Sequence, residues 1–145
     1  DLGWLLWLIS FTKDNIASLN TRLEFTADLL ASLFAVSMMF DDQSSFVGLK
    51  PSECVERLES FPVNAVEAMG YVARDPRVKE FFDEYISKWR YIKPHTTGND
   101  LKALGIEPGP RYAVILRQLR NAWLNGDVKT EEEEKKLLST LISST

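Results

Sequence analysis

The sequence predicts an all-α fold, with about eight to nine short helices in a helical array. Apolar residues recur at helical spacing along most of the 145 residues. No run of useful length shows the alternation or the β-branched composition that is typical of a strand. Proline or glycine lies at the boundaries of most of the apolar segments. We expect two segments, residues 1–48 and 49–145, with the polar stretch 41–50 marking the boundary between them.

The first three helices are expected over residues 3–11, from about Asp14, and over 26–40. The third is apolar nearly all round, which predicts a central buried helix. No segment reaches the roughly 18–20 apolar residues that span a bilayer, so no membrane partner is expected. No leader pattern precedes the first apolar run, and we therefore expect a cytoplasmic protein cut from a longer one.

The middle of the chain carries strong helix starts. Pro51 and Pro62 each open a helix, and Asp75-Pro76 combines a capping carboxylate with a proline at the first helical position. Apolar side chains then follow at helical spacing. They predict an amphipathic helix whose core residues are Phe81, Phe82, Tyr85 and Trp89.

The last third predicts three more helices. Thr97 or Asn99 caps a short helix that ends at Gly105, where glycine suits the left-handed stop. A Pro-Gly-Pro turn leads into a longer helix over 111–124, and Thr130 with Glu133 forms a capping box for the final helix.

The inventory of catalytic groups is thin. Cys54 is the single cysteine, which excludes an internal disulfide and a cysteine zinc site. His95 lies in a loop with no nucleophile motif near it, and it is expected to be solvated. The acidic run 131–134 is explained by the dipole of the helix that it begins. The sequence has no phosphate loop and no dinucleotide fingerprint. Nothing in it supports catalysis.

Charge is more informative. The chain has a net charge of −4, which excludes a globally basic nucleic-acid binder. Residues 88–120 nevertheless hold seven basic and two acidic side chains, a local charge of +5. With the N–H groups that follow Gly109, these residues are candidates for phosphate binding: Lys88, Arg90, Lys93, Lys102, Arg111, Arg117 and Arg120. The alternative is an ordinary solvated helix face.

One segment carries a family resemblance. Residues 97–112 read Thr-Gly-Asn-Asp-Leu-Lys-Ala-Leu-Gly-Ile-Glu-Pro-Gly-Pro-Arg-Tyr, and Leu-Asn-Gly-Asp-Val follows at 124–128 before an acidic cap. This pattern resembles the C-terminal signature of bacterial-type tRNA nucleotidyltransferases, the CCA-adding or A-adding enzymes of the poly(A) polymerase superfamily. A weaker similarity to the helical body of these enzymes extends the resemblance over nearly the whole chain.

The resemblance implies a C-terminal tRNA-binding fragment with no catalytic residues of its own, in which 1–48 is a body segment and 49–145 a tail domain. The family's catalytic head has a Gly-Ser start and an Asp-x-Asp metal pair, and neither occurs here. Mg²⁺ and ATP or CTP would bind in that missing head, and the fragment would hold no cofactor. The parent enzyme would add CMP or AMP to tRNA 3′ ends. The expected partners are the N-terminal catalytic part and tRNA, held by shape and phosphate contacts along its acceptor stem and T arm.

Two other interpretations remain. A helical protein–protein interaction module with no RNA role would explain the same composition. A DNA-binding helix-turn-helix is suggested by the turn 105–110, but Pro-Gly-Pro makes a wider turn than that motif uses, and the next helix begins without base-reading side chains.

Overall fold

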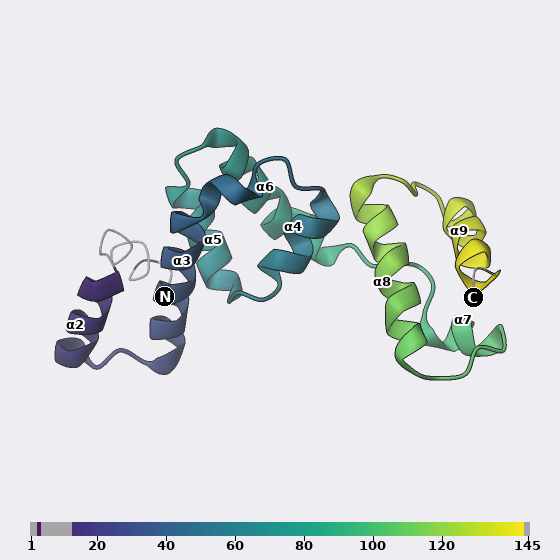
Figure 1. The fold of residues 1–145 in the computed structure, drawn as a ribbon, viewed down its shortest axis with the longest axis horizontal. Helices are drawn as coiled ribbons and strands as arrows, with labels where there is room; N and C mark the ends of the chain where they lie inside the picture. Colours follow the sequence, from purple (N-terminus) through teal and green to yellow (C-terminus); the bar gives the residue numbers. More distant parts are fainter. Residues whose placement is uncertain (1–2, 4–12, 144–145) are drawn as a thin grey trace. The chain divides into compact units, whose positions relative to one another are not determined.

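The computed structural model describes Gly3 and residues 13–143 of the chain. These residues form eight α-helices and two short 3-10 helices, with no strand among them (Figure 1). The all-α prediction is therefore confirmed. The helix expected over 3–11 lies, except for Gly3, outside the described residues. The elements are α2 (Lys13–Leu23), α3 (Ala27–Asp41), η1 (Gln43–Phe46), α4 (Pro51–Leu58), α5 (Val63–Val72), α6 (Pro76–Ser87), η2 (Trp89–Tyr91), α7 (Gly98–Ala103), α8 (Pro110–Asn125) and α9 (Glu131–Ser143).

The chain divides into two compact units. The first contains Asp1–Leu49 and Glu53–Arg90, and the second contains Lys50–Ser52 and Tyr91–Thr145. This division differs from the expected segments 1–48 and 49–145. The physical reason is that α5 packs against both α3 and α6, so the chain on either side of the loop 41–50 contributes to one core.

The first unit is built on apolar burial. Thr26 begins α3, where its hydroxyl accepts a hydrogen bond from the backbone N–H of Leu29. The side chains that α3 to α6 and η1 bury almost completely are Leu33, Val36, Met39, Phe46, Val55, Leu58, Val66, Met69, Val78 and Phe82. The helix α3 is not buried all round, however, because Phe34 and Met38 stay exposed on its outer face.

The amphipathic helix expected after Asp75 is present as α6, and the Asp75 carboxylate accepts from the N–H of Arg77 at its start. Phe82 and Tyr85 are buried as predicted, whereas Phe81 is only half-buried. Trp89 is also buried, but it lies in η2 beyond the end of α6. Its ring contacts that of Phe81, with 5.8 Å between the ring centroids.

The second unit packs α7 and α9 against α8. Its core consists of Leu101, Ile106, Ile115, Leu119 and Leu138. Gly105 has a φ of +79°, the left-handed conformation that ends α7 and lets Ile106 turn back into this core. Thr97 caps α7, and the predicted capping box of Thr130 and Glu133 begins α9. No helix in the described part of the chain is both long and apolar enough to cross a membrane.

Candidate nucleic-acid interface

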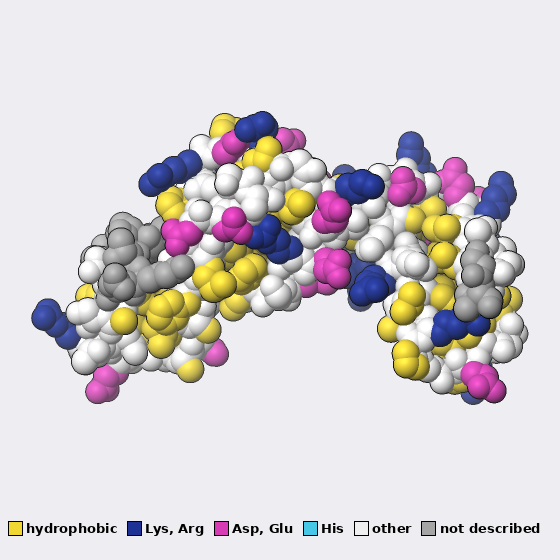
Figure 2. Space-filling view, viewed as in Figure 1, with side chains coloured by type: hydrophobic (Ala, Val, Ile, Leu, Met, Phe, Trp, Pro, Cys, Tyr) yellow, Lys and Arg dark blue, Asp and Glu magenta, His cyan; other side chains and the backbone are white. Residues whose placement is uncertain are grey.

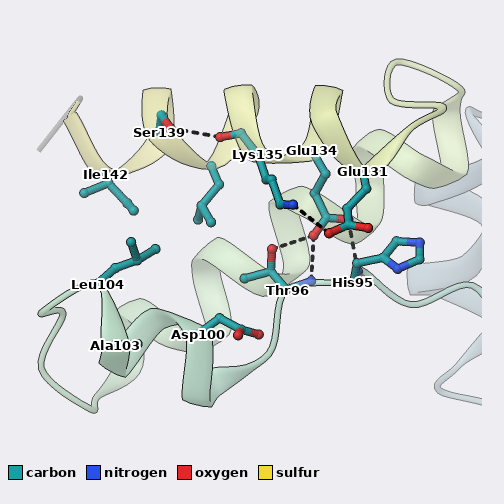
Figure 3. Close-up of a pocket in the computed structure, with 11 residues that line it drawn as sticks. His95, Thr96, Asp100, Ala103, Leu104, Glu131, Glu134, Lys135, Ser139 and Ile142 are labelled. Carbon is teal, nitrogen blue, oxygen red and sulfur yellow. Dashed lines mark hydrogen bonds and ion pairs between the residues drawn. The ribbon is translucent and has the colours of Figure 1, made fainter.

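The second unit contains a buried carboxylate, Glu134, in the first turn of α9 (Figure 3). Its Oε1 accepts from the backbone N–H of Thr96 at 2.7 Å and from the Thr96 hydroxyl at 2.5 Å. Its Oε2 accepts from the backbone N–H of His95 at 3.0 Å and from the indole N–H of Trp123 on α8. The side chain is 1% exposed, and its two oxygens are fully used by these four donors.

The pKa of Glu134 reflects two opposed causes. Burial of the carboxyl raises its pKa, and the four hydrogen bonds lower it. The hydrogen bonds prevail, so the pKa lies below its ordinary value of 4.5 and the side chain carries a full negative charge at neutral pH.

The same arrangement fixes the segment that enters the second unit. Ile92 precedes the two residues that Glu134 contacts. Its backbone carbonyl accepts a hydrogen bond from the Nε–H of Arg120 on α8 at 2.9 Å. The His95 ring lies against the Trp123 ring, with 5.3 Å between their centroids. We call residues 92–96 the connector. It is held at both ends by α8 and α9.

Three of the predicted phosphate-binding residues lie on the connector or on the part of α8 that is bonded to it. Lys93 directly follows Ile92, so its backbone lies beside Arg120. Arg117 precedes Arg120 by one helical turn on α8. Lys93 and Arg117 are exposed, while Arg120 is half-buried and uses its Nε within the unit. Lys93, Arg117 and Arg120 are the basic cluster of this unit.

The other predicted site residues lie apart from this cluster. Gly109 precedes α8 and Arg111 lies in its first turn, where the Arg111 guanidinium donates to the carbonyl of Ile142 near the end of α9. Lys102 is exposed on α7. Lys88 and Arg90 belong to the first unit, where Lys88 pairs with Glu84 at 3.7 Å. In the view of Figure 2, Lys and Arg side chains are spread over the surface of both units.

A groove of about 540 Å³ also lies within the second unit, between α7 and α9. Leu104, Leu138 and Ile142 give it an apolar wall. At its polar end Lys135 is held by Glu131, with 2.7 Å between the ammonium and the carboxylate (Figure 3). The cation that lines this groove is therefore already neutralised and adds nothing to the basic cluster.

The described residues offer no donor set for a catalytic metal. No group of three or more His, Cys, Asp or Glu side chains gathers among them. In the acidic pair at 41–42, Asp42 is ion-paired with Arg57. Cys54 is fully buried, and burial outweighs the opposing effect of Arg57 to raise its pKa to about 12, so its thiol is unreactive near neutral pH.

Glu134 is the buried residue of this region that sequence reasoning missed. The sequence explains the acidic run 131–134 by the dipole of the helix that it begins, and three of its four members are exposed. The signal that distinguishes the fourth is its helical phase. Glu134 precedes Leu137 and Leu138 by three and four residues, which places it on the apolar face of α9.

Comparison with known proteins gives a partial match. A segment of 71 residues is 39% identical to an A-adding tRNA nucleotidyltransferase of Geobacter sulfurreducens. The match covers 49% of this chain and 8% of that protein, so the chain corresponds to a small part of the relative's length. No protein-family model matches the chain. No solved structure matches it either. The 71-residue similarity supports a relationship between this chain and tRNA nucleotidyltransferases.

Proposed function

We propose that this chain is a C-terminal, tRNA-binding part of a tRNA nucleotidyltransferase and that it does not itself transfer nucleotides. The observation that carries the proposal is the basic cluster of Lys93, Arg117 and Arg120, whose members lie on the connector and on the part of α8 bonded to it, in a chain with a net charge of −4. The similarity to an A-adding enzyme supports the same conclusion.

The physical task fits the arrangement. A protein that must hold every tRNA reads the shape of an A-form helix and its phosphates rather than base edges. Exposed cations on a rigid helical surface supply such contacts, because each neutralised phosphate releases bound counterions. We propose that the acceptor stem and T arm lie along this surface, with Lys102, Arg111 and the N–H groups after Gly109 as further contacts. Lys88 and Arg90, which belong to the first unit, remain separate candidates for phosphate contacts.

The whole enzyme would do the chemistry elsewhere. In this proposal a separate N-terminal catalytic part holds Mg²⁺ and ATP or CTP and adds CMP or AMP to the tRNA 3′ end in the cytoplasm. The carboxylates of the described residues do not form a site that fits those ions.

The test is a competition experiment with the 145-residue chain. Labelled tRNA is displaced by unlabelled tRNA, by unstructured RNA of the same length, and by DNA duplex. We expect tRNA to compete best, because only it presents the A-form stem. Equal competition by all three would contradict shape recognition. In parallel, tRNA that lacks its 3′ end should stay unextended with Mg²⁺ and labelled ATP, and extension that persists after repurification would contradict the non-catalytic role.

A protein–protein interaction module is the second candidate, because α3 carries an exposed apolar stripe. Ala27, Ala31, Phe34 and Met38 are all exposed and are spaced by four, three and four residues, the spacing of a helix-packing seam. Figure 2 shows hydrophobic side chains at the surface of the first unit. Both surfaces are tested by their effect on tRNA affinity. If neither the Phe34→Ser, Met38→Ser double variant nor removal of the basic cluster changes tRNA affinity, this second function replaces the first.

A further inference from the structure

The backbone of the second unit is fixed by hydrogen bonds on both sides of Lys93. Arg120 fixes the carbonyl of Ile92, the residue before Lys93. Glu134 fixes the N–H groups of His95 and Thr96, the second and third residues after it. Pro94 lies between them, and its ring limits the backbone to one φ.

Within this segment Lys93 is the outward-facing cation. Its side chain is exposed, and it has no ion-pair or hydrogen-bond partner among residues 13–143. A lysine on a mobile chain would lose backbone freedom when it bound a phosphate, and that loss would weaken binding. A lysine on a backbone already fixed does not pay this cost.

We propose that Glu134 is a positioning residue for RNA binding: through its three hydrogen bonds from His95 and Thr96 it holds the connector so that Lys93 is already in position to contact a phosphate. The inference rests on the proposed function, since it names the residue that organises one of its contacts. Glu134 itself is buried and does not touch RNA.

Simple electrostatics predicts the opposite effect of removing the Glu134 charge on RNA affinity, which makes the inference testable. Glu134 carries a negative charge in the unit that would bind a polyanion. If charge alone mattered, Glu134→Gln would strengthen RNA binding or leave it unchanged. If Glu134 positions Lys93, the same substitution weakens binding, because the uncharged amide can no longer accept from all four donors.

The experiment is a double-mutant cycle in the full 145-residue chain, with a tRNA transcript as the probe at one salt concentration. The variants are Glu134→Gln, Lys93→Ala and the two combined. We expect Glu134→Gln to weaken binding about fivefold when Lys93 is present and less than about twofold when it is absent, as for directly coupled neighbours. Glu132→Gln is the matched control, because it removes an exposed charge two residues away without touching the connector.

Thr96→Val is a second variant, which tests the same inference in case Glu134→Gln does not fold. It removes one of the four donors and leaves every charge in place. We expect it to weaken tRNA binding in the same Lys93-dependent way, by a smaller factor. Circular dichroism establishes that each variant is folded at the temperature of the binding assay.

The outcomes separate the inference from the proposed function. If the wild-type chain does not bind tRNA, both fail. If it binds tRNA but Glu134→Gln binds as tightly as wild type, or weakens binding equally with and without Lys93, the positioning role is overturned and the proposed function stands. The same holds if Lys93→Ala alone has no effect.

Discussion

The two units of this chain are stabilised in different ways. In the first, α3, α5 and α6 bury a set of large apolar side chains, and the buried polar group on α3 is a single hydroxyl, that of Ser32. In the second, five apolar side chains form the core and a charged carboxylate is buried beside them. Burial of apolar area is non-directional, whereas a carboxylate with four donors specifies one arrangement. The comparison suggests that the first unit is built for stability and the second for the placement of particular backbone groups.

The largest expected effect is in the apolar unit. Phe82 is fully buried, and its ring contacts that of Phe46 with 5.2 Å between centroids. Phe82→Ala should lower the free energy of unfolding by about 3–5 kcal/mol in chemical denaturation, because it removes buried area and leaves a cavity. Phe81→Ala, at a half-buried position on the same helix, is the control and should cost less. A loss below about 1 kcal/mol for Phe82→Ala would show that burial does not dominate this unit.

The next largest effect is expected in the second unit, where the buried carboxylate contributes to stability. Glu134→Gln should lower its stability by about 1.5–3 kcal/mol, since hydrogen bonds to a charged group are lost. The indole N–H resonance of Trp123 should shift in the NMR spectrum, because that group donates to Glu134. The substitution should leave the unfolding of the first unit unchanged.

The pH dependence of this loss has a definite sign. Hydrogen bonding holds the pKa of Glu134 below 4.5 in the folded chain, against the opposing effect of burial. Its contribution is therefore complete above about pH 5 and is lost as the pH falls through the folded pKa. The stability difference between wild type and Glu134→Gln should shrink as the pH is lowered from 5 to 3. A difference that stays constant over this range would contradict the charged, buried carboxylate.

The smallest perturbation uses Cys54 as a probe of the first unit. Its thiol is fully buried, and burial raises its pKa to about 12. A disulfide reagent at pH 8 should label it slowly in the native chain and rapidly in denaturant. Fast labelling of the native chain would indicate that the apolar unit opens readily.

The fold could be predicted because its signals are local. Caps such as Thr26, Asp75 and the pair Thr130–Glu133 act within a few residues of themselves, and each begins the expected helix. The division into units could not be predicted, because it depends on α5 packing against both α3 and α6, and α3 and α6 are distant from each other in sequence.

The candidate site was only partly accessible to sequence reasoning. Local charge identified the basic side chains of residues 88–120. It could not show that Arg120 uses its Nε on the carbonyl of Ile92, or that Arg111 donates to the end of α9. Both are long-range hydrogen bonds to backbone carbonyls, which leave no trace in composition. The hydrogen bonds of Glu134 could not be predicted for the same reason, since their donors lie 38, 39 and 11 residues before it in the sequence.

The central claim is that the basic cluster binds tRNA phosphates, and a salt series tests it most directly. The affinity of the chain for tRNA is measured from low to moderate salt for wild type, for Lys93→Ala combined with Arg117→Ala, and for Arg22→Ala, which removes an exposed charge from α2. Each lost phosphate contact should reduce the slope of log affinity against log salt by up to about one unit. The account predicts a slope reduced by up to about two units in the double variant and unchanged in Arg22→Ala. An unchanged affinity and slope in a folded double variant would contradict it.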